Sequence, residues 1–63
     1  MRLKELRKNR SVTQKEVAKA IICTPTVYSR YEREEREPDI ETLILLANYF
    51  NVTVDYLIGR TAQ

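Results

Sequence analysis

The sequence predicts an all-α domain of five short helices, on three observations. Apolar residues recur at helical spacing in successive segments, and no segment is convincing as a strand. A chain of 63 residues has room for one domain, which buries only roughly 60% of its unfolded surface. We therefore expect residues 1–63 to form a single domain with a small core and a frayed tail at residues 60–63. Four of the expected helices follow a residue suited to cap a helix N-terminus, namely Thr13, Thr24, Asp39 or Thr53.

Two helices joined by a tight turn are expected at about residues 14–33. Thr13 caps the first helix, and Glu16, three residues later, completes the pattern of a capping box. Thr24 followed by Pro25 restarts the chain as a second helix, because proline is favoured at the first helical position. Helices this short can bury their apolar sides only by crossing steeply, which predicts a helix-turn-helix. The expected inward residues are Val17, Ala18 and Ile21 in the first helix and Val27, Tyr28 and Tyr31 in the second.

Three further helices are expected around this pair. Residues 2–9 form the first, in which Arg7 lies at the edge of the buried face and needs a hydrogen-bond acceptor. Residues 40–50 carry the widest apolar stripe of the chain, and a last helix at residues 54–58 stops at Gly59. The stripe consists of Ile40, Leu43, Ile44, Leu46, Ala47 and Phe50.

The composition excludes several kinds of site. Cys23 is the only cysteine and there is no histidine, so no disulfide, metal or cofactor is expected. Cys23 is expected to pack as a small apolar residue, and a redox-sensing thiol is the less favoured alternative. Without a histidine, a phosphate-binding glycine loop or a carboxylate pair in an apolar pocket, we expect no enzyme, and no small-molecule ligand is evident. No apolar run reaches the roughly 20 residues of a membrane span and no signal peptide opens the chain, so a cytoplasmic protein is expected.

Charge is distributed unevenly along the chain. Residues 1–33 carry nine basic and three acidic side chains, a net charge of +6, whereas residues 34–63 carry two basic and six acidic side chains, a net charge of −4. The basic half contains the helix pair. Such polarity suits a polyanionic partner on one side of the domain, although an ordinary solvated helix surface would also produce it.

The chain resembles the phage repressor and Cro type of helix-turn-helix regulator, also called XRE-like. The resemblance covers nearly the whole chain, with its elements in the order and spacing of the family. It implies a compact five-helix, lambda-repressor-like fold. The matching pieces are Gln14 with Ala18, the run from Thr24 to Arg33, Glu37-Pro38, the run from Glu41 to Leu43 with Leu46-Ala47, and the run from Val52 to Gly59.

The resemblance implies a sequence-specific transcriptional regulator of double-stranded DNA, expected to be a repressor that binds a palindromic operator as a homodimer. Its second helix would lie in the major groove, where the N-terminal residues of a recognition helix reach base edges. Arg30 would either read guanine or clamp a phosphate, and Lys15 would contact phosphate unless it is only a solubilising charge. The expected base contacts are Pro25, Thr26, Ser29 and Arg30, and the expected phosphate contacts are Gln14, Arg10, Lys15 and Arg33.

The resemblance also implies one internal ion pair and one self-association surface. Arg7 is expected to pair with Glu32 near the end of the recognition helix, in a largely buried and mainly structural contact. The dimer surface is expected at the end of the chain, at Val54, Tyr56 and Leu57. Tyr56 would alternatively be partly buried against the last helix.

The chain departs from the family pattern at Ser11, Ile22 and Glu34, where glycine is usual. Glycine is preferred there because a positive φ costs it nothing, and β-branched isoleucine is the least suited replacement. Either Ile22 holds a strained turn, or the preceding helix runs longer and the turn differs. We favour the longer helix.

Glu34 and Glu35 stand where relatives often carry lysine, and two carboxylates near a phosphate backbone would weaken binding. This acidic loop leaves a second function open. The fold would then serve as a protein-interaction module, such as an antitoxin or anti-repressor, with weak or no specific binding to DNA.

Overall fold

The computed structural model describes residues 1–59, and the expected frayed tail lies outside these residues. The all-α prediction is confirmed, because five helices and no strand occupy the described part of the chain. Each expected helix is present and, apart from the end of α2, the helix ends lie within about one residue of those predicted. The helices are α1 (Leu3–Asn9), α2 (Gln14–Ala20), α3 (Pro25–Glu32), α4 (Ile40–Phe50) and α5 (Val54–Ile58).

Local side-chain bonds explain why four of the helices begin where they do. The side-chain oxygens of Thr13, Thr24, Asp39 and Thr53 each accept from the backbone N–H three residues later. At α2 the bond is reciprocal, because the Glu16 carboxylate also accepts from the Thr13 amide at 2.8 Å.

The helices end in residues with positive φ, and here one expectation is wrong. Ile22 has φ +59°, so α2 is not extended and the turn is the strained form that we did not favour. The equivalent places after α1 and α3 are also held by residues other than glycine: Ser11 has φ +56° and Glu34 has φ +59°. Only α5 ends on glycine, with Gly59 at φ +84°.

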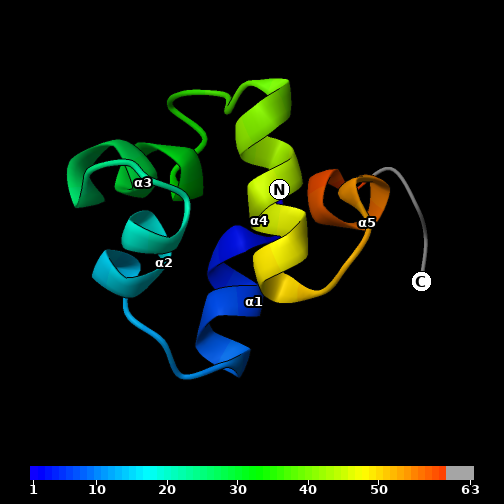
Figure 1. Cartoon of the computed structure of the whole chain (residues 1–63), viewed down its shortest axis with the longest axis horizontal. Helices are drawn as coiled ribbons and strands as arrows, with labels where there is room; N and C mark the ends of the chain where they lie inside the picture. The colour runs from blue at the N-terminus through cyan, green and yellow to red at the C-terminus, as the bar shows by residue number, and fades with distance from the viewer. Residues whose placement is uncertain (60–63) are drawn as a thin grey trace.

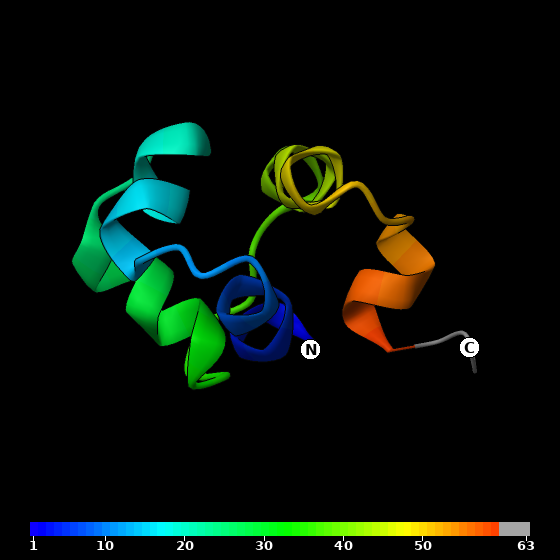
Figure 2. The same ribbon diagram turned by 90° about the horizontal axis from the view of Figure 1, so that it is seen from below.

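The helix pair lies at one end of the molecule and α5 lies at the other. Figure 1 shows α2 and α3 side by side at one end of the long axis, with α1 and α4 between them and α5. Figure 2, seen from below, shows the same separation of the α2–α3 pair from α5. The two central helices, α1 and α4, therefore support the α2–α3 pair. The core consists of Leu3, Val17, Ala18, Ile21, Tyr28, Tyr31, Leu46, Ala47, Phe50 and Leu57.

The apolar stripe of α4 is only partly used by this core. Leu46, Ala47 and Phe50 are buried as expected, but Ile40 is 68% exposed and Ile44 is 47% exposed. The prediction that these two isoleucines face the core is wrong. An eleven-residue helix at the surface of so small a domain has more apolar positions than its neighbours can cover.

Two arginines satisfy the carbonyl ends of α4 and α5. Arg10 donates to the carbonyl oxygens of Tyr49 at 3.3 Å and Phe50 at 2.9 Å. Arg2 donates to the carbonyl of Tyr56 at 3.1 Å, with its guanidinium 4.7 Å from the centre of that tyrosine ring. A cation at a helix C-terminus also interacts favourably with the helix dipole. The structure thus gives Arg10 a capping role that was not anticipated from the sequence, and its expected phosphate contact stays a prediction.

Candidate nucleic-acid interface

The outer face of α3 is open to solvent and its inner face is fixed in the core. Pro25, Thr26 and Arg30 are exposed, and Ser29 is half-buried. On the opposite face of the helix, Tyr28 and Tyr31 are buried in edge-to-face contact, with ring centroids 6.5 Å apart. No segment of residues 1–59 covers Thr26 or Arg30, so a groove-shaped partner has access to this face.

The start of α3 is set rigidly by its sequence. Thr24 caps the helix by accepting from the Val27 amide at 3.2 Å, and Pro25 occupies the first turn. Just before this cap, the half-buried Cys23 packs against the core and donates through its thiol to the carbonyl of Thr24. Burial raises the pKa of the Cys23 thiol, which favours the packing role over a reactive thiolate.

A buried ion pair joins α1 to the end of α3. The Arg7 Nε donates to Glu32 Oε2 at 2.6 Å, and its Nη2 lies 3.4 Å from Oε1. This is the pair that the family resemblance implies, and only 15% of the Arg7 side chain and 3% of the Glu32 side chain are exposed. Arg7 also donates to the carbonyl of Val12 at 3.0 Å, which fixes the loop before α2.

Both members of this pair keep their charges. Burial by itself would raise the pKa of Glu32, but its polar neighbours, first among them the hydrogen-bonded and charged Arg7, outweigh burial and lower that pKa. The hydrogen bond to Glu32 likewise raises the pKa of Arg7. The fully buried phenol of Tyr28 stays neutral, because its pKa is raised above the ordinary tyrosine value by desolvation.

The four expected phosphate contacts do not form one group. Lys15 is exposed at the start of α2, beside Gln14, which is half-buried. Arg33 lies just past the end of α3, but its Nε is 3.1 Å from Glu35, so this guanidinium is already paired. Arg10 is the one that caps α4. Of the four residues, only Gln14 and Lys15 therefore lie next to each other, at the beginning of α2.

Sequence reasoning missed the partners of these polar side chains. The Nε2 of Gln14 donates to Glu32 Oε1 at 2.9 Å, a contact that spans 18 residues and carries no periodic signal. The Arg33–Glu35 pair could have been anticipated, because opposite charges two residues apart just beyond a helix end can meet in the turn.

The expected dimer surface needs one correction. Leu57 is completely buried in the protomer, so it cannot line an interface between two copies. Val54 and Tyr56 are half-buried and keep part of their surface available. A last helix of only five residues must use its most apolar position to anchor itself to the core.

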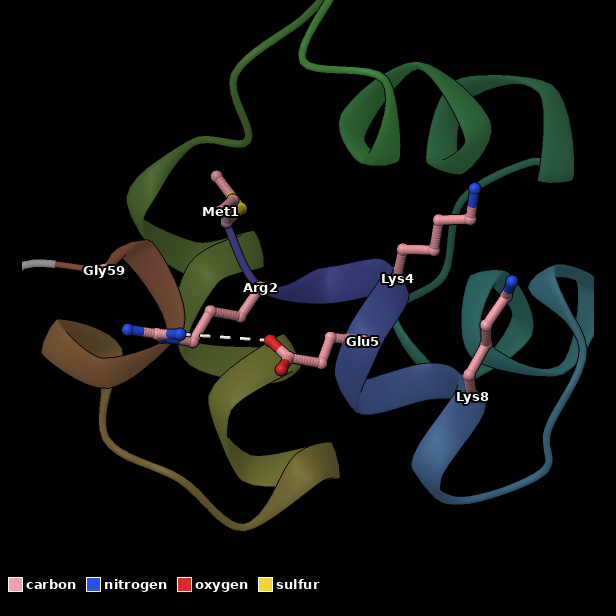
Figure 3. A pocket seen from close by; sticks show the side chains of 6 residues that line it. All are labelled: Met1, Arg2, Lys4, Glu5, Lys8 and Gly59. Atoms are coloured by element: carbon pink, nitrogen blue, oxygen red, sulfur yellow. Dashed lines mark ion pairs between the residues drawn. The ribbon is translucent and has the colours of Figure 1, made fainter. Parts of the chain in front are cut away.

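Other features of the described residues point to no competing site. A shallow pocket of about 570 Å³ lies along α1, and Figure 3 shows Arg2 and Glu5 facing each other within it while Lys4 and Lys8 lie on the other side of the helix. Its lining is mostly charged, unlike the enclosed apolar pockets that hold small molecules. Within residues 1–59 no group of three metal-ligating side chains occurs, and no helix is long and apolar enough to cross a membrane.

Comparison of the sequence with known proteins finds one matching family and several similar proteins. A family model for helix-turn-helix domains matches residues 3–57. The HTH-type transcriptional regulator ImmR of Bacillus subtilis (strain 168) is 46% identical over 59 residues, which cover 94% of this chain and 46% of ImmR. The cryptic phage CTXphi transcriptional repressor RstR of Vibrio cholerae is 36% identical over 61 residues, covering 97% of this chain and 54% of RstR.

A third relative is named as an activator, whereas RstR is named as a repressor. The HTH-type transcriptional activator BcrR of Enterococcus faecalis is 30% identical over 58 residues, covering 92% of this chain and 28% of BcrR. The chain spans about half the length of the curated relatives it matches first, and no solved structure is significantly similar to it. These relatives are named as regulators of transcription and not as enzymes. The chain belongs to the XRE-type helix-turn-helix family of DNA-binding transcriptional regulators.

Proposed function

We propose that this domain binds a specific double-stranded DNA sequence by placing α3 in the major groove. The observation that carries the proposal is the exposed polar face of α3 opposite two buried tyrosines. A helix fits the major groove of B-form DNA, where side-chain donors and acceptors distinguish base pairs. Arg30 offers a guanidinium that matches guanine, while Thr26 and Ser29 can donate or accept, and Pro25 offers an apolar contact to a thymine methyl group.

The start of α2 supplies contacts to the DNA backbone. Lys15 adds a positive charge there, and Gln14 adds side-chain and backbone N–H donors, which suit a phosphate oxygen. Arg33 would join them only after it leaves Glu35. Backbone contacts of this kind position the helix but carry no sequence information.

High affinity requires two copies. A single module buries only about 600–1,000 Å², whereas specific sites are commonly bound at ~10⁻⁸ M or tighter. Two domains related by a two-fold axis would meet half-sites about 34 Å apart in a palindromic operator. Val54 and Tyr56 on α5 are the residues that we propose for this contact, and Leu57 is excluded by its burial.

Repression is the regulatory outcome that we propose, since occupation of DNA that polymerase needs is sufficient to repress. One relative is named as a repressor and another as an activator, so repression is our own proposal for the whole protein. The work of such a regulator takes place where the DNA is, in the cytoplasm of a bacterial cell.

One observation favours a second function, a protein-interaction module of the same fold. Ile40, Ile44 and Leu45 leave apolar surface exposed on α4, next to the acidic loop at residues 34–37. Such a module would show little preference among DNA sequences and a flat response of DNA affinity to salt.

Selection of bound sequences from a random pool of duplexes tests the two functions together. The proposed function predicts an enriched palindrome whose half-sites are about 34 Å apart between centres. A pool that stays random after several rounds would remove sequence-specific binding and leave the interaction module.

A further inference from the structure

The carboxylate of Glu32 contacts two side chains from two other helices. Its Oε2 accepts from Arg7 Nε at 2.6 Å, and its Oε1 accepts from Gln14 Nε2 at 2.9 Å. Arg7 is held in turn by the carbonyl of Val12. Because Glu32 is the last residue of α3 and Gln14 the first of α2, this network connects α1, the loop after it, the start of α2 and the end of α3.

A buried carboxylate dictates the orientation of the amide that faces it. The amide of glutamine has a donor end and an acceptor end, whereas an ionised carboxylate only accepts. The Glu32 side chain is almost fully buried and stays ionised, so Gln14 must turn its NH₂ group toward it. Within residues 1–59 that NH₂ group has one acceptor, which leaves its second hydrogen for another.

We propose that Glu32 is a positioning residue for the DNA backbone contact, because it orients the Gln14 NH₂ group to donate its second hydrogen to a phosphate oxygen. This inference rests on the proposed function. It gives the Arg7–Glu32 pair a role in binding beyond joining helices. A side chain already held in its bound orientation loses less conformational freedom on association, so the arrangement strengthens binding without adding a contact.

A double-mutant cycle separates positioning from simple maintenance of the fold. The variants are Gln14→Ala, Glu32→Gln and the double substitution, and the probe is a 20-base-pair duplex of mixed sequence, since a phosphate contact does not depend on sequence. Fluorescence anisotropy gives the dissociation constants at a temperature where circular dichroism shows every variant folded.

We expect Gln14→Ala to weaken binding about tenfold, as for the loss of a hydrogen bond to a charged group. Glu32→Gln should weaken binding about fivefold in the wild-type background and less than twofold in the Gln14→Ala background. Equal losses in both backgrounds would overturn the proposal, because Glu32 would then act without Gln14. The control pair is Gln14→Ala with Arg30→Ala, whose effects on affinity should multiply independently.

A measurement on the unmodified protein covers the case in which Glu32→Gln does not fold. Nuclear magnetic resonance of the DNA-free protein should show the two Gln14 side-chain amide protons well separated, with one protected by its hydrogen bond. Addition of the duplex should shift the other. A freely averaging Gln14 side chain would overturn the proposal. If the wild type binds no duplex at all, both the proposed function and this inference fail. If the wild type binds DNA but the affinity losses of Gln14→Ala and Glu32→Gln are additive, only this inference fails.

Discussion

The backbone N–H of Cys23 donates to the carbonyl of Ala18 at 2.9 Å, across the turn that separates α2 from α3. This bond requires the intervening Ile22 to adopt positive φ, and the side chain of that residue is 87% exposed. A left-handed conformation costs a non-glycine residue about 1–2 kcal/mol, and an exposed side chain recovers little of that cost by packing. The turn that joins the two helices is therefore held under strain.

Ile22→Gly should stabilise the domain by about 1 kcal/mol, because glycine removes the strain but adds freedom to the unfolded chain. In a domain of this size the melting temperature should rise by roughly 4–8 °C. Thermal unfolding followed by circular dichroism measures the change. Ile22→Val is the matched control and should leave the melting temperature where it is, since valine keeps the β-branch. A variant with glycine that melts at or below the wild-type temperature would show that the turn is not strained.

The starts of α2 to α5 could be predicted from the sequence, whereas the end of α2 could not. From α2 to α5 each N-terminus is fixed by a bond within three residues, such as the one from the Val27 amide to Thr24, so the local sequence sets where these helices begin. The end of α2 depends instead on a turn that Ile22 disfavours and that the packing of α2 against α3 enforces. Local preference favoured a longer helix, and tertiary structure overrode it.

The exposed face of the candidate site and, through the family resemblance, the Arg7–Glu32 pair could be predicted, but the partners of Gln14 and Arg10 could not. Helical spacing alone places Thr26 and Arg30 opposite Tyr28, and the structure places them there. The partners of Arg10 lie 39 and 40 residues away, and such distant pairings leave no periodic trace in a single sequence. For the same reason the exposure of Ile44 depends on how much of α4 the other helices can cover.

Glu32 should make the stability of the domain depend on pH in the acid range. Its pKa in the folded state lies below the ordinary value of 4.5, so the folded state binds this proton less readily than the unfolded state. The stabilisation is complete above about pH 5 and is lost as the pH falls through the folded pKa. Glu32→Gln should lower the free energy of unfolding by about 2 kcal/mol at pH 7, and this difference from the wild type should shrink toward pH 3. Urea titrations at several pH values measure it.

Ile22→Gly is the control for this acid effect. It changes no titratable group, so its difference from the wild type should be the same at pH 7 and at pH 4. A Glu32→Gln difference that stays constant down to pH 3 would show that the carboxylate is not bonded preferentially in its ionised form.

Glu35→Gln should strengthen binding to DNA. It releases the Arg33 guanidinium from a pair in which both side chains are more than half exposed, and it removes a negative charge near the end of α3. Such surface pairs are worth up to about 1 kcal/mol, so we expect a gain of about threefold at low salt and a steeper fall of affinity with salt. Asp55→Asn is the control, because α5 lies at the opposite end of the long axis (Figure 1) and screening limits its effect. An equal gain from both variants would indicate net charge alone.

Tyr56 and Leu57 should respond differently to truncation if α5 forms the dimer contact. Tyr56→Ala should weaken self-association about tenfold, as for an interface aromatic residue. Leu57→Ala should instead lower the free energy of unfolding by about 3 kcal/mol, because it creates a cavity in the core. Sedimentation equilibrium measures the first effect and urea unfolding the second. Self-association that is indifferent to Tyr56→Ala would move the interface away from α5.

Reading of bases by the exposed face of α3 is tested most directly by comparing Arg30→Ala with Lys15→Ala on two duplexes. One duplex carries the selected site and the other a scrambled sequence of the same length, and the quantity measured is the ratio of their dissociation constants. We predict that Arg30→Ala costs about 1–3 kcal/mol on the selected site and reduces the ratio, because in the proposed complex Arg30 contacts a base. Lys15→Ala should weaken both duplexes alike and leave the ratio unchanged. A ratio that survives Arg30→Ala would contradict base reading by this residue, and one that also survives Thr26→Ala and Ser29→Ala would contradict base reading by this face.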